Sequence, residues 1–390
     1  MLAGRQGRAL QLAMRMLVAV ARATGADALI PAQSAHVGLS LSSLGLAGVE
    51  LLEDFAASGA RFAISTTTNV LSMQRDAVAE SPLQLRALAA MVRMGAIDNC
   101  SCNPFVQGHG PRLGEHAAWS ESATAPYINS VLGARTNREG ATALASALTG
   151  VTPRYGMHLD SERRAGTLFR VTAPLPGLHS YHLLAAAISR RASGGIPVIA
   201  GLPARPVQDA LFGFCAAFAT YSTQAMFHMV GITPEAPSLD ALYPGGMPTA
   251  VNIGHAELEA ELAGMRRCAP ADAQLVVIGC PHASLTQLHE IGGLLATSRV
   301  APGRRMLVHT NRDVLASAAQ AGVLGVLRAA GVEVTVDTCA YVGLSAYPDG
   351  STLVTDSSKM AFLMASRGLR TAVASTQECV HAALGQATRS

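Results

Sequence analysis

Charge is scarce in this chain of 390 residues, and no long uncharged apolar run stands in for it. Only 14% of the residues are Asp, Glu, Lys or Arg, and the formal net charge is +3. So small a balance, without a basic cluster, gives no support for a nucleic-acid partner. The sequence also lacks an apolar stretch of the length that a membrane-spanning helix needs. The expected partners are therefore a small molecule or another protein.

Lysine is almost absent. Of the 29 basic residues, only Lys359 is a lysine, and the others are arginines. A GC-rich genome explains much of this bias, but the exception invites a chemical reason. A buried ammonium group can lose its proton, whereas a guanidinium group cannot. Lys359 is therefore a catalytic candidate, and the alternative is a helix-start residue that faces water.

Several familiar cofactor patterns are missing as well. The seven cysteines are odd in number and scattered, which argues against a secreted disulfide framework and for a reducing cytoplasm. No CxxC pair is present, so a ribbon-type zinc site is not expected. Neither a GxGxxG after a strand nor a GxxxxGK[ST] occurs, which disfavours the alternative of a nucleotide-binding α/β enzyme.

The residues that are present indicate a densely packed globular protein. Hydrophobic residues make up 49% of the chain, and 390 residues suffice for two or three domains. The first 28 residues superficially resemble a signal peptide, but Arg15 and Arg22 interrupt the apolar run. Apolar residues recur there at helical spacing, so an amphipathic first helix is predicted.

The C-terminal part alternates short apolar strands with helices, which predicts a parallel, doubly wound sheet. Strands are expected within 273–279, 304–310, 332–338, 352–355 and 370–376. One helix should begin near Ser284, a typical N-cap, and the next should run through 312–331. An N-terminal α/β region over 1–230, with more than one subdomain, and a C-terminal domain over 231–390 are expected.

Two cysteines stand at the ends of predicted strands. Cys280 follows the apolar run at 275–278, and Cys339 directly follows the strand at 332–338. Carboxyl ends of parallel strands share one edge of the sheet, where α/β proteins place their chemistry. Lys359 follows the next strand on the same edge. A zinc site of Cys102, Cys280, His282 and Cys339 and an iron–sulfur cluster are both open on this pattern.

Five motifs in order carry a specific resemblance: GEHAAWSES, NSVLGARTNREG, LTGVTPRYGMHLD, IGCPHASL and VDTC. Together they resemble the large, catalytic subunit of the aconitase X family. The resemblance implies an aconitase-like α/β fold, with several doubly wound parallel-sheet domains around a central cleft. It also implies an iron–sulfur cluster, [2Fe–2S] or [4Fe–4S], held by Cys102, Cys280 and Cys339.

The resemblance further implies an iron–sulfur hydro-lyase that dehydrates a small β-hydroxy acid. The preferred substrate is cis-3-hydroxy-L-proline, giving Δ1-pyrroline-2-carboxylate, and the alternative is mevalonate 5-phosphate or another β-hydroxy acid. The family's small swivelling domain is not found in these residues, so a separate small subunit, carrying a serine base, is the expected partner. A cluster-free α/β scaffold or regulatory subunit is the non-enzyme alternative.

The remaining candidates are polar residues in the matched motifs and after predicted strands. Arg135 and Arg138 could clamp the substrate carboxylate through a bidentate fork, with surface ion pairing as the alternative. Ser34 and His36 are candidates for catalysis together with Lys359. The predicted substrate-binding residues are Thr67, Asn69, Asn129, Ser130, Arg135, Thr136, Asn137 and Arg138.

Overall fold

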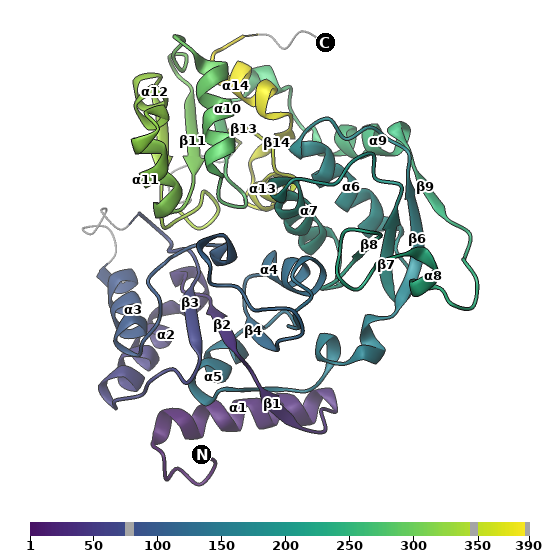
Figure 1. Cartoon of the computed structure of the whole chain (residues 1–390). Coiled ribbons are helices and arrows are strands. Elements are labelled where there is room, and N and C mark those ends of the chain that lie inside the picture. The colour runs from purple at the N-terminus through teal and green to yellow at the C-terminus, as the bar shows by residue number, and fades with distance from the viewer. Residues whose placement is uncertain (75–81, 344–349, 387–390) are drawn as a thin grey trace. The chain divides into compact units, whose positions relative to one another are not determined.

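Two units divide the chain in the computed structural model, which describes residues 1–74, 82–343 and 350–386 (Figure 1). The first unit comprises residues 1–170, 192–200 and 223–251. The second unit comprises residues 171–191, 201–222 and 252–390. Among the described residues, no helix is both long and apolar enough to cross a membrane.

The second unit is built on a five-stranded parallel sheet. Its strands are β10 (Leu275–Ile278), β11 (Arg305–His309), β12 (Val332–Thr335), β13 (Thr352–Thr355) and β14 (Arg370–Val373). They lie in the order β12-β11-β10-β13-β14, and every printed pairing between them is parallel. The predicted doubly wound sheet is therefore confirmed, and the order reverses between β10 and β13.

Both faces of this sheet are covered, because successive side chains of a strand point to opposite faces. On β10, Val276 and Ile278 join a core with α10 (Leu285–Leu295), α12 (Val323–Ala329) and α14 (Thr376–Ala383). Leu275 and Val277 pack on the opposite face with residues of α13 (Ser358–Ala365). This burial on both faces explains the uninterrupted apolar run of the strand. The other helices of this unit are α6 (Leu178–Arg191), α7 (Gln208–Tyr221), α9 (His255–Met265) and α11 (Arg312–Gln320).

Helix boundaries follow local capping chemistry. The Ser284 side chain accepts a hydrogen bond from the amide of Gln287, so the predicted N-cap of α10 is confirmed. The prediction of one helix through 312–331 is wrong, because α11 ends at Gln320 and α12 begins at Val323. Gly322 lies between them with a φ of 78°, a left-handed conformation that interrupts a helix.

The first unit contains the parallel sheet β3-β2-β4, formed by β3 (Ser65–Thr68), β2 (Ser34–Val37) and β4 (Ala117–Trp119). Its remaining strands are β1 (Leu29–Pro31), β5 (Val151–Pro153), β6 (Ala165–Val171), β7 (Ile196–Ala200) and β8 (His228–Met229), and β9 (Val251–Ile253) crosses the unit boundary. The first pair is antiparallel, and the others form the sheet β8-β7-β6-β9.

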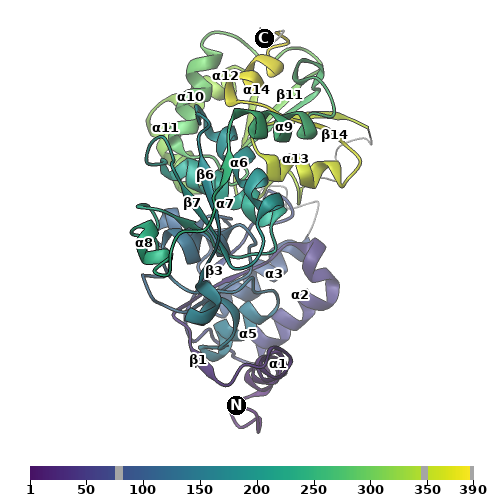
Figure 2. The same ribbon diagram turned by 90° about the vertical axis from the view of Figure 1, so that its right-hand side faces the viewer.

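The predicted amphipathic first helix is α1 (Arg8–Thr24), which packs against α5 (Thr142–Thr149) through Ala9, Ala13 and Leu17 (Figure 1). Nearby, α2 (Leu41–Ala57) and α3 (Pro82–Arg93) lie side by side (Figure 2). The short helices α4 (Thr124–Pro126) and α8 (Leu239–Leu242) complete this unit. Its main core thus backs the sheet that contains His36 and Thr67.

Candidate functional site

The strand-order reversal in the second unit places Cys280 and Asp356 at the ends of two adjacent strands. Cys280 follows β10 after one intervening glycine, and Asp356 follows β13 directly. Since β10 and β13 pair in parallel, both residues lie at the same edge of the sheet. Lys359 is the second residue of α13, three residues beyond Asp356, and is half-buried.

A small polar cavity lies against this edge. It has a volume of about 20 Å³, which is room for one water molecule. Its polar lining includes Cys280, His282, His182, Asp209 and Asp356. Asp209 accepts a hydrogen bond from the Ser284 hydroxyl at 2.5 Å, which ties α7 to the start of α10.

Burial sets the protonation state of two residues that line this cavity, Asp356 and His182. It raises the pKa of Asp356 to about 7, although the Thr376 hydroxyl, which donates to its carboxylate, lowers that pKa. Burial lowers the pKa of His182 to about 3, so this ring is neutral at pH 7. Asp356 was not among the sequence candidates, because a single aspartate in TDSSK gives no sign that it will be buried.

Cys339 lies on a loop beyond the sheet edge. The expectation that its strand runs up to it is wrong, because β12 ends at Thr335. Asp337, between the strand and the cysteine, has a φ of 68°, so the backbone turns away from the extended path. Cys280 and Cys339 are both half-buried, as is the third predicted ligand, Cys102.

In the first unit, His36 and Thr67 lie on neighbouring strands at paired positions. The Thr67 hydroxyl donates to the Ala35 carbonyl at 3.3 Å and lies 2.8 Å from His36 Nδ1. Because that hydroxyl has one proton, His36 Nδ1 is the donor in the second contact. Burial lowers the pKa of His36 to about 4, with Glu121 and Asn69 opposing the shift. The ring is neutral at pH 7, and its Nε2 atom is an acceptor.

Next to His36 lies a group of polar residues: Asn69 follows β3, Ser120 and Glu121 follow β4, and Arg138 forms a parallel bridge with Trp119 of β4. The Asn69 amide donates to Glu121 at 3.1 Å. His36 Nε2, Asn69 Oδ1 and Ser120 Oγ are buried without a hydrogen-bond partner among the described residues, although Asn69 lies close enough to act on the His36 pKa. Burial lowers the pKa of Arg138, and Glu121 raises it. We call these five residues the strand-end pocket.

The cost of burying polar atoms without partners suggests that this pocket binds a polar ligand. It contains three of the sequence candidates, His36, Asn69 and Arg138, with Thr67 behind them. Ser120 and Glu121 were missed, although they lie within the motif GEHAAWSES. The only available signal was their position after a short apolar stretch, which β4 explains.

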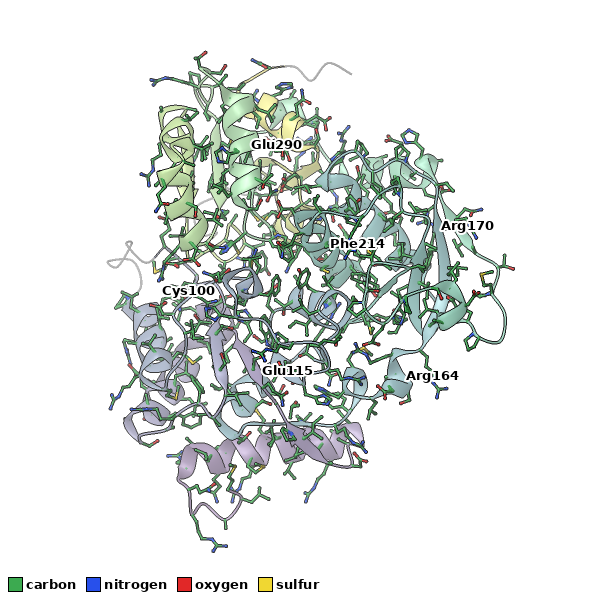
Figure 3. The ribbon with its side chains drawn as sticks, viewed as in Figure 1. Cys100, Glu115, Arg164, Arg170, Phe214 and Glu290 are labelled. Atoms are coloured by element: carbon green, nitrogen blue, oxygen red, sulfur yellow. The ribbon has the colours of Figure 1, made fainter. Side chains whose placement is uncertain are left out.

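Cys102 belongs to the same side of the first unit. The amide of Ser101 donates to the carbonyl of Thr68, the last residue of β3, at 3.1 Å. This bond fixes Cys102 in a loop at the end of the strand. Cys100, labelled in Figure 3, differs, since it is fully buried. Its thiol contacts Asp98 and Thr68.

The other polar candidates have extensive contacts with the protein. Asn129 bonds to the backbone of Thr136 and Ala225 and to Arg163, and Ser130 accepts from the Phe227 amide. Asn137 bonds to Tyr155 and Met157, and Arg135 pairs with Asp160. Ser34 accepts from the indole of Trp119. The structure brings none of these contacts into the strand-end pocket, and their binding roles stay predictions.

The cysteines divide by environment in a way that bears on metal binding. Cys215 and Cys379 are fully buried within helices, and burial raises the pKa of both thiols. A protonated thiol is a poor ligand. Cys102, Cys280 and Cys339 instead lie half-buried on loops, and none of the seven cysteines forms a disulfide. Cys268 is also half-buried outside the helices, but burial raises its thiol pKa and the thiol donates to the Arg370 carbonyl. Cys102, Cys280 and Cys339 are therefore the preferred donors, and their meeting at one group stays a prediction.

Three comparisons with known proteins point to one family. Family models described as aconitase X first, second and third domain match residues 1–161, 165–263 and 273–385. The phosphomevalonate dehydratase large subunit of Thermococcus kodakarensis is 33% identical over 373 residues, covering 94% of this chain and 93% of the relative.

The cis-3-hydroxy-L-proline dehydratase of Pseudomonas aeruginosa is 34% identical over 400 residues, covering 99% of this chain and 69% of the relative. Among solved structures, holo-form aconitase X of Thermococcus kodakaraensis matches with a TM-score of 0.86 at 31% identity. That match covers 97% of this chain and 96% of the other.

Proposed function

This chain belongs to the aconitase X family and is a hydro-lyase, and we propose that it dehydrates cis-3-hydroxy-L-proline as the large subunit of a two-chain enzyme. The reaction removes the hydroxyl from C3 and a proton from C2, the carbon next to the carboxylate. The resulting enamine tautomerises to Δ1-pyrroline-2-carboxylate.

The observation that carries this choice is the charge pattern of the strand-end pocket. The charges of Glu121 and Arg138 attract each other, since Glu121 raises the pKa of Arg138 whereas burial lowers it. A zwitterionic amino acid matches such a pair, with its carboxylate on Arg138 and its ammonium on Glu121. A phosphate dianion would be repelled by Glu121 in the same place. The pocket therefore favours hydroxyproline over mevalonate 5-phosphate.

Within this pocket, each residue has a distinct task. Arg138 is held by a hydrogen bond to the Gln224 carbonyl at 2.8 Å, which orients the guanidinium group. Neutral His36 presents Nε2 as an acceptor for a substrate N–H or O–H. Asn69 holds Glu121 in place through the hydrogen bond between their side chains. Such fixed groups orient the substrate before reaction.

An iron–sulfur cluster fits the thiols that the chain offers. Cys102, Cys280 and Cys339 would hold it, since these three cysteines lie half-buried on loops that follow strands and not within buried helices. With three protein ligands, one iron atom would keep a free coordination position. When bound, the cluster would supply a Lewis acid for the substrate hydroxyl. Lys359, at the start of α13, stays our candidate for a catalytic residue.

A separate small subunit is supported by the names of the relatives. This chain covers 93% of a relative that is named a large subunit, but only 69% of the Pseudomonas enzyme. The remaining part of that longer protein has no counterpart in the match. We assign the base that removes the C2 proton to the missing subunit.

The proposal is tested with the large and small subunits produced together under anaerobic conditions. We expect kcat/KM for cis-3-hydroxy-L-proline to exceed that for mevalonate 5-phosphate by about 10-fold or more, the effect of one misplaced buried charge. Glu121→Gln should narrow this ratio of kcat/KM values, and Glu115→Gln, a change at a half-buried glutamate of the same segment (Figure 3), should not. Preference for the phosphate by the unmodified enzyme would overturn the substrate assignment.

A further inference from the structure

The loops that carry Cys280 and Cys339 follow strands that are not neighbours. In the sheet of the second unit, β11 lies between β10 and β12. Neighbouring strands are about 4.8 Å apart, so the ends of these two strands are about 10 Å apart. Two thiols that serve one group must therefore be brought together by their loops, across the end of β11.

The Cys280 loop is fastened to the end of β11 on both sides of the cysteine. Gly279 has a φ of 105°, and a β-carbon there would collide with the carbonyl of His309. The amide of Ala283 donates to that same carbonyl at 2.8 Å, and the Thr310 hydroxyl donates to the Ala283 carbonyl at 2.7 Å. The loop therefore has one defined path over the strand end.

The Cys339 loop is fixed by an ion pair. Asp337 is 3% exposed and has a left-handed φ of 68°. Arg312 Nε and Nη2 both donate to one carboxylate oxygen, Asp337 Oδ2, at 3.1 Å and 2.9 Å, and Nε lies 2.8 Å from Oδ1. This pair holds the backbone two residues before Cys339 in a conformation that few residue types adopt.

His282 joins the two loops directly. Its Nε2 atom lies 3.0 Å from the carbonyl oxygen of Thr338, and the side chain is 3% exposed. A carbonyl only accepts, so Nε2 carries the proton and donates it. One hydrogen bond thus connects the residue two places after Cys280 with the residue immediately before Cys339.

We propose that His282 is a positioning residue, whose hydrogen bond to the Thr338 carbonyl holds the Cys280 and Cys339 thiols in register, that is, in a fixed position relative to each other. The polypeptide sets this position without a bound metal. The pair of Arg312 and Asp337 supports that geometry from the Cys339 side. The functional meaning of this register rests on the proposed role of the two cysteines as cluster ligands.

The first test measures the geometry in the full chain stripped of iron. A short bis-alkylating reagent such as dibromobimane links two nearby thiols, and peptide mapping reports the rate for Cys280 with Cys339. His282→Leu removes the donor, His282→Gln keeps an N–H close to the Nε2 position, and His289→Leu is the exposed control on α10. We expect a rate about five-fold lower in His282→Leu, as for one lost hydrogen bond. The other two variants should match the unmodified chain.

An unchanged cross-linking rate in His282→Leu overturns the proposal. Should that variant fail to fold, Arg312→Lys provides the same test at a partly exposed position. Lysine keeps the positive charge but loses the two guanidinium N–H groups that donate to Asp337. We expect slower cross-linking there too, and a rate equal to that of the unmodified chain would contradict the proposed support.

The second test measures how fast a chelator removes iron from the reconstituted protein. We expect removal to be about five-fold faster in His282→Leu and close to normal in His282→Gln. This separates the two proposals. If Cys280→Ser retains iron as well as the unmodified chain does, the cluster assignment fails, whereas the cross-linking rates still decide the role of His282.

Discussion

Identical side chains in this protein have different chemistry because they have different surroundings. Cys379 lies in the core of α14, where burial raises its thiol pKa, whereas Cys280 lies half-buried on a loop after β10. His36 is fully buried, and burial lowers its pKa to about 4. At this scale, function follows from the position of a residue at a strand end rather than from its type.

His36 gives a direct test at the residue scale. His36→Asn retains a donor near the Nδ1 position for Thr67 and removes the Nε2 acceptor. We expect kcat/KM to fall by about 10- to 100-fold, the cost of leaving a bound polar group unpaired. Steady-state kinetics with added small subunit measure this change, and the melting temperature checks the fold. Full activity in a folded His36→Asn variant would remove His36 from the site.

Buried neutral histidines also predict the response of the free energy of unfolding to pH. Burial lowers the pKa of His158 to about 3, below its unfolded value of about 6.5. The folded state therefore binds fewer protons, so stability is present above pH 6.5 and is lost as the pH falls toward 3. Between pH 7 and pH 5, His158 should account for about 2 kcal/mol of that loss.

Urea unfolding of the unmodified chain and His158→Gln at both pH values measures this contribution. We expect the difference between pH 7 and pH 5 to shrink by about 2 kcal/mol in the variant. His255→Gln, a change at an exposed histidine, serves as the control. If the free energy of unfolding had the same pH dependence in all three proteins, protonation of His158 would not destabilise the folded state.

At the scale of elements, the apolar run 275–278 was sufficient to predict β10, because a strand buried on both faces needs no polar alternation. Ser284 similarly predicted the start of α10, since its capping contact is local. The ends of strands carrying Cys280 and Lys359 were therefore accessible from sequence, and with them the edge where the proposed chemistry lies.

Features that depend on distant residues were not accessible in this way. The end of β12 at Thr335 is set where Asp337 turns toward Arg312, which is 25 residues earlier in the chain. The break at Gly322 was hidden by a continuous helical pattern through 312–331. Glu121, half-buried near Asn69, and Asp356, buried after β13, gain their roles from residues that are distant in the sequence, and no local pattern in the sequence reports those surroundings.

The turn between β10 and its cysteine gives a test at this scale. Gly279→Ala should destabilise the protein by at least about 2 kcal/mol and lower its iron content, because the new methyl group meets the His309 carbonyl at a left-handed φ. Gly293→Ala on the exposed side of α10 is the matched control, since its β-carbon meets nothing within 4 Å.

We expect Gly293→Ala to stabilise the protein by about 0.5–1 kcal/mol, the usual gain for this change in an exposed helix. Chemical denaturation and iron analysis of both variants measure the two effects. If Gly279→Ala were as stable and as rich in iron as Gly293→Ala, the path of the Cys280 loop would affect neither stability nor iron binding.

At the scale of the whole molecule, the chain is 33% identical to a relative named a large subunit. We expect the purified chain alone to show at most about 1% of the activity that it shows with a family small subunit, since a missing general base costs about 100-fold or more. A titration of activity against added small subunit measures this dependence. Saturation at a fixed ratio is expected, and full activity of the isolated chain would contradict a separate partner.

The central claim is that Cys280 helps to hold an iron–sulfur cluster at the edge of a parallel sheet. The measurement that tests it most directly is the iron and acid-labile sulfide content per chain after strictly anaerobic purification, for the unmodified protein, Cys280→Ser and Cys379→Ser. Near-stoichiometric cluster in the first and third proteins, lost in Cys280→Ser, is the predicted result. Equal iron and sulfide in all three, or none in any of them after reconstitution, would contradict the claim.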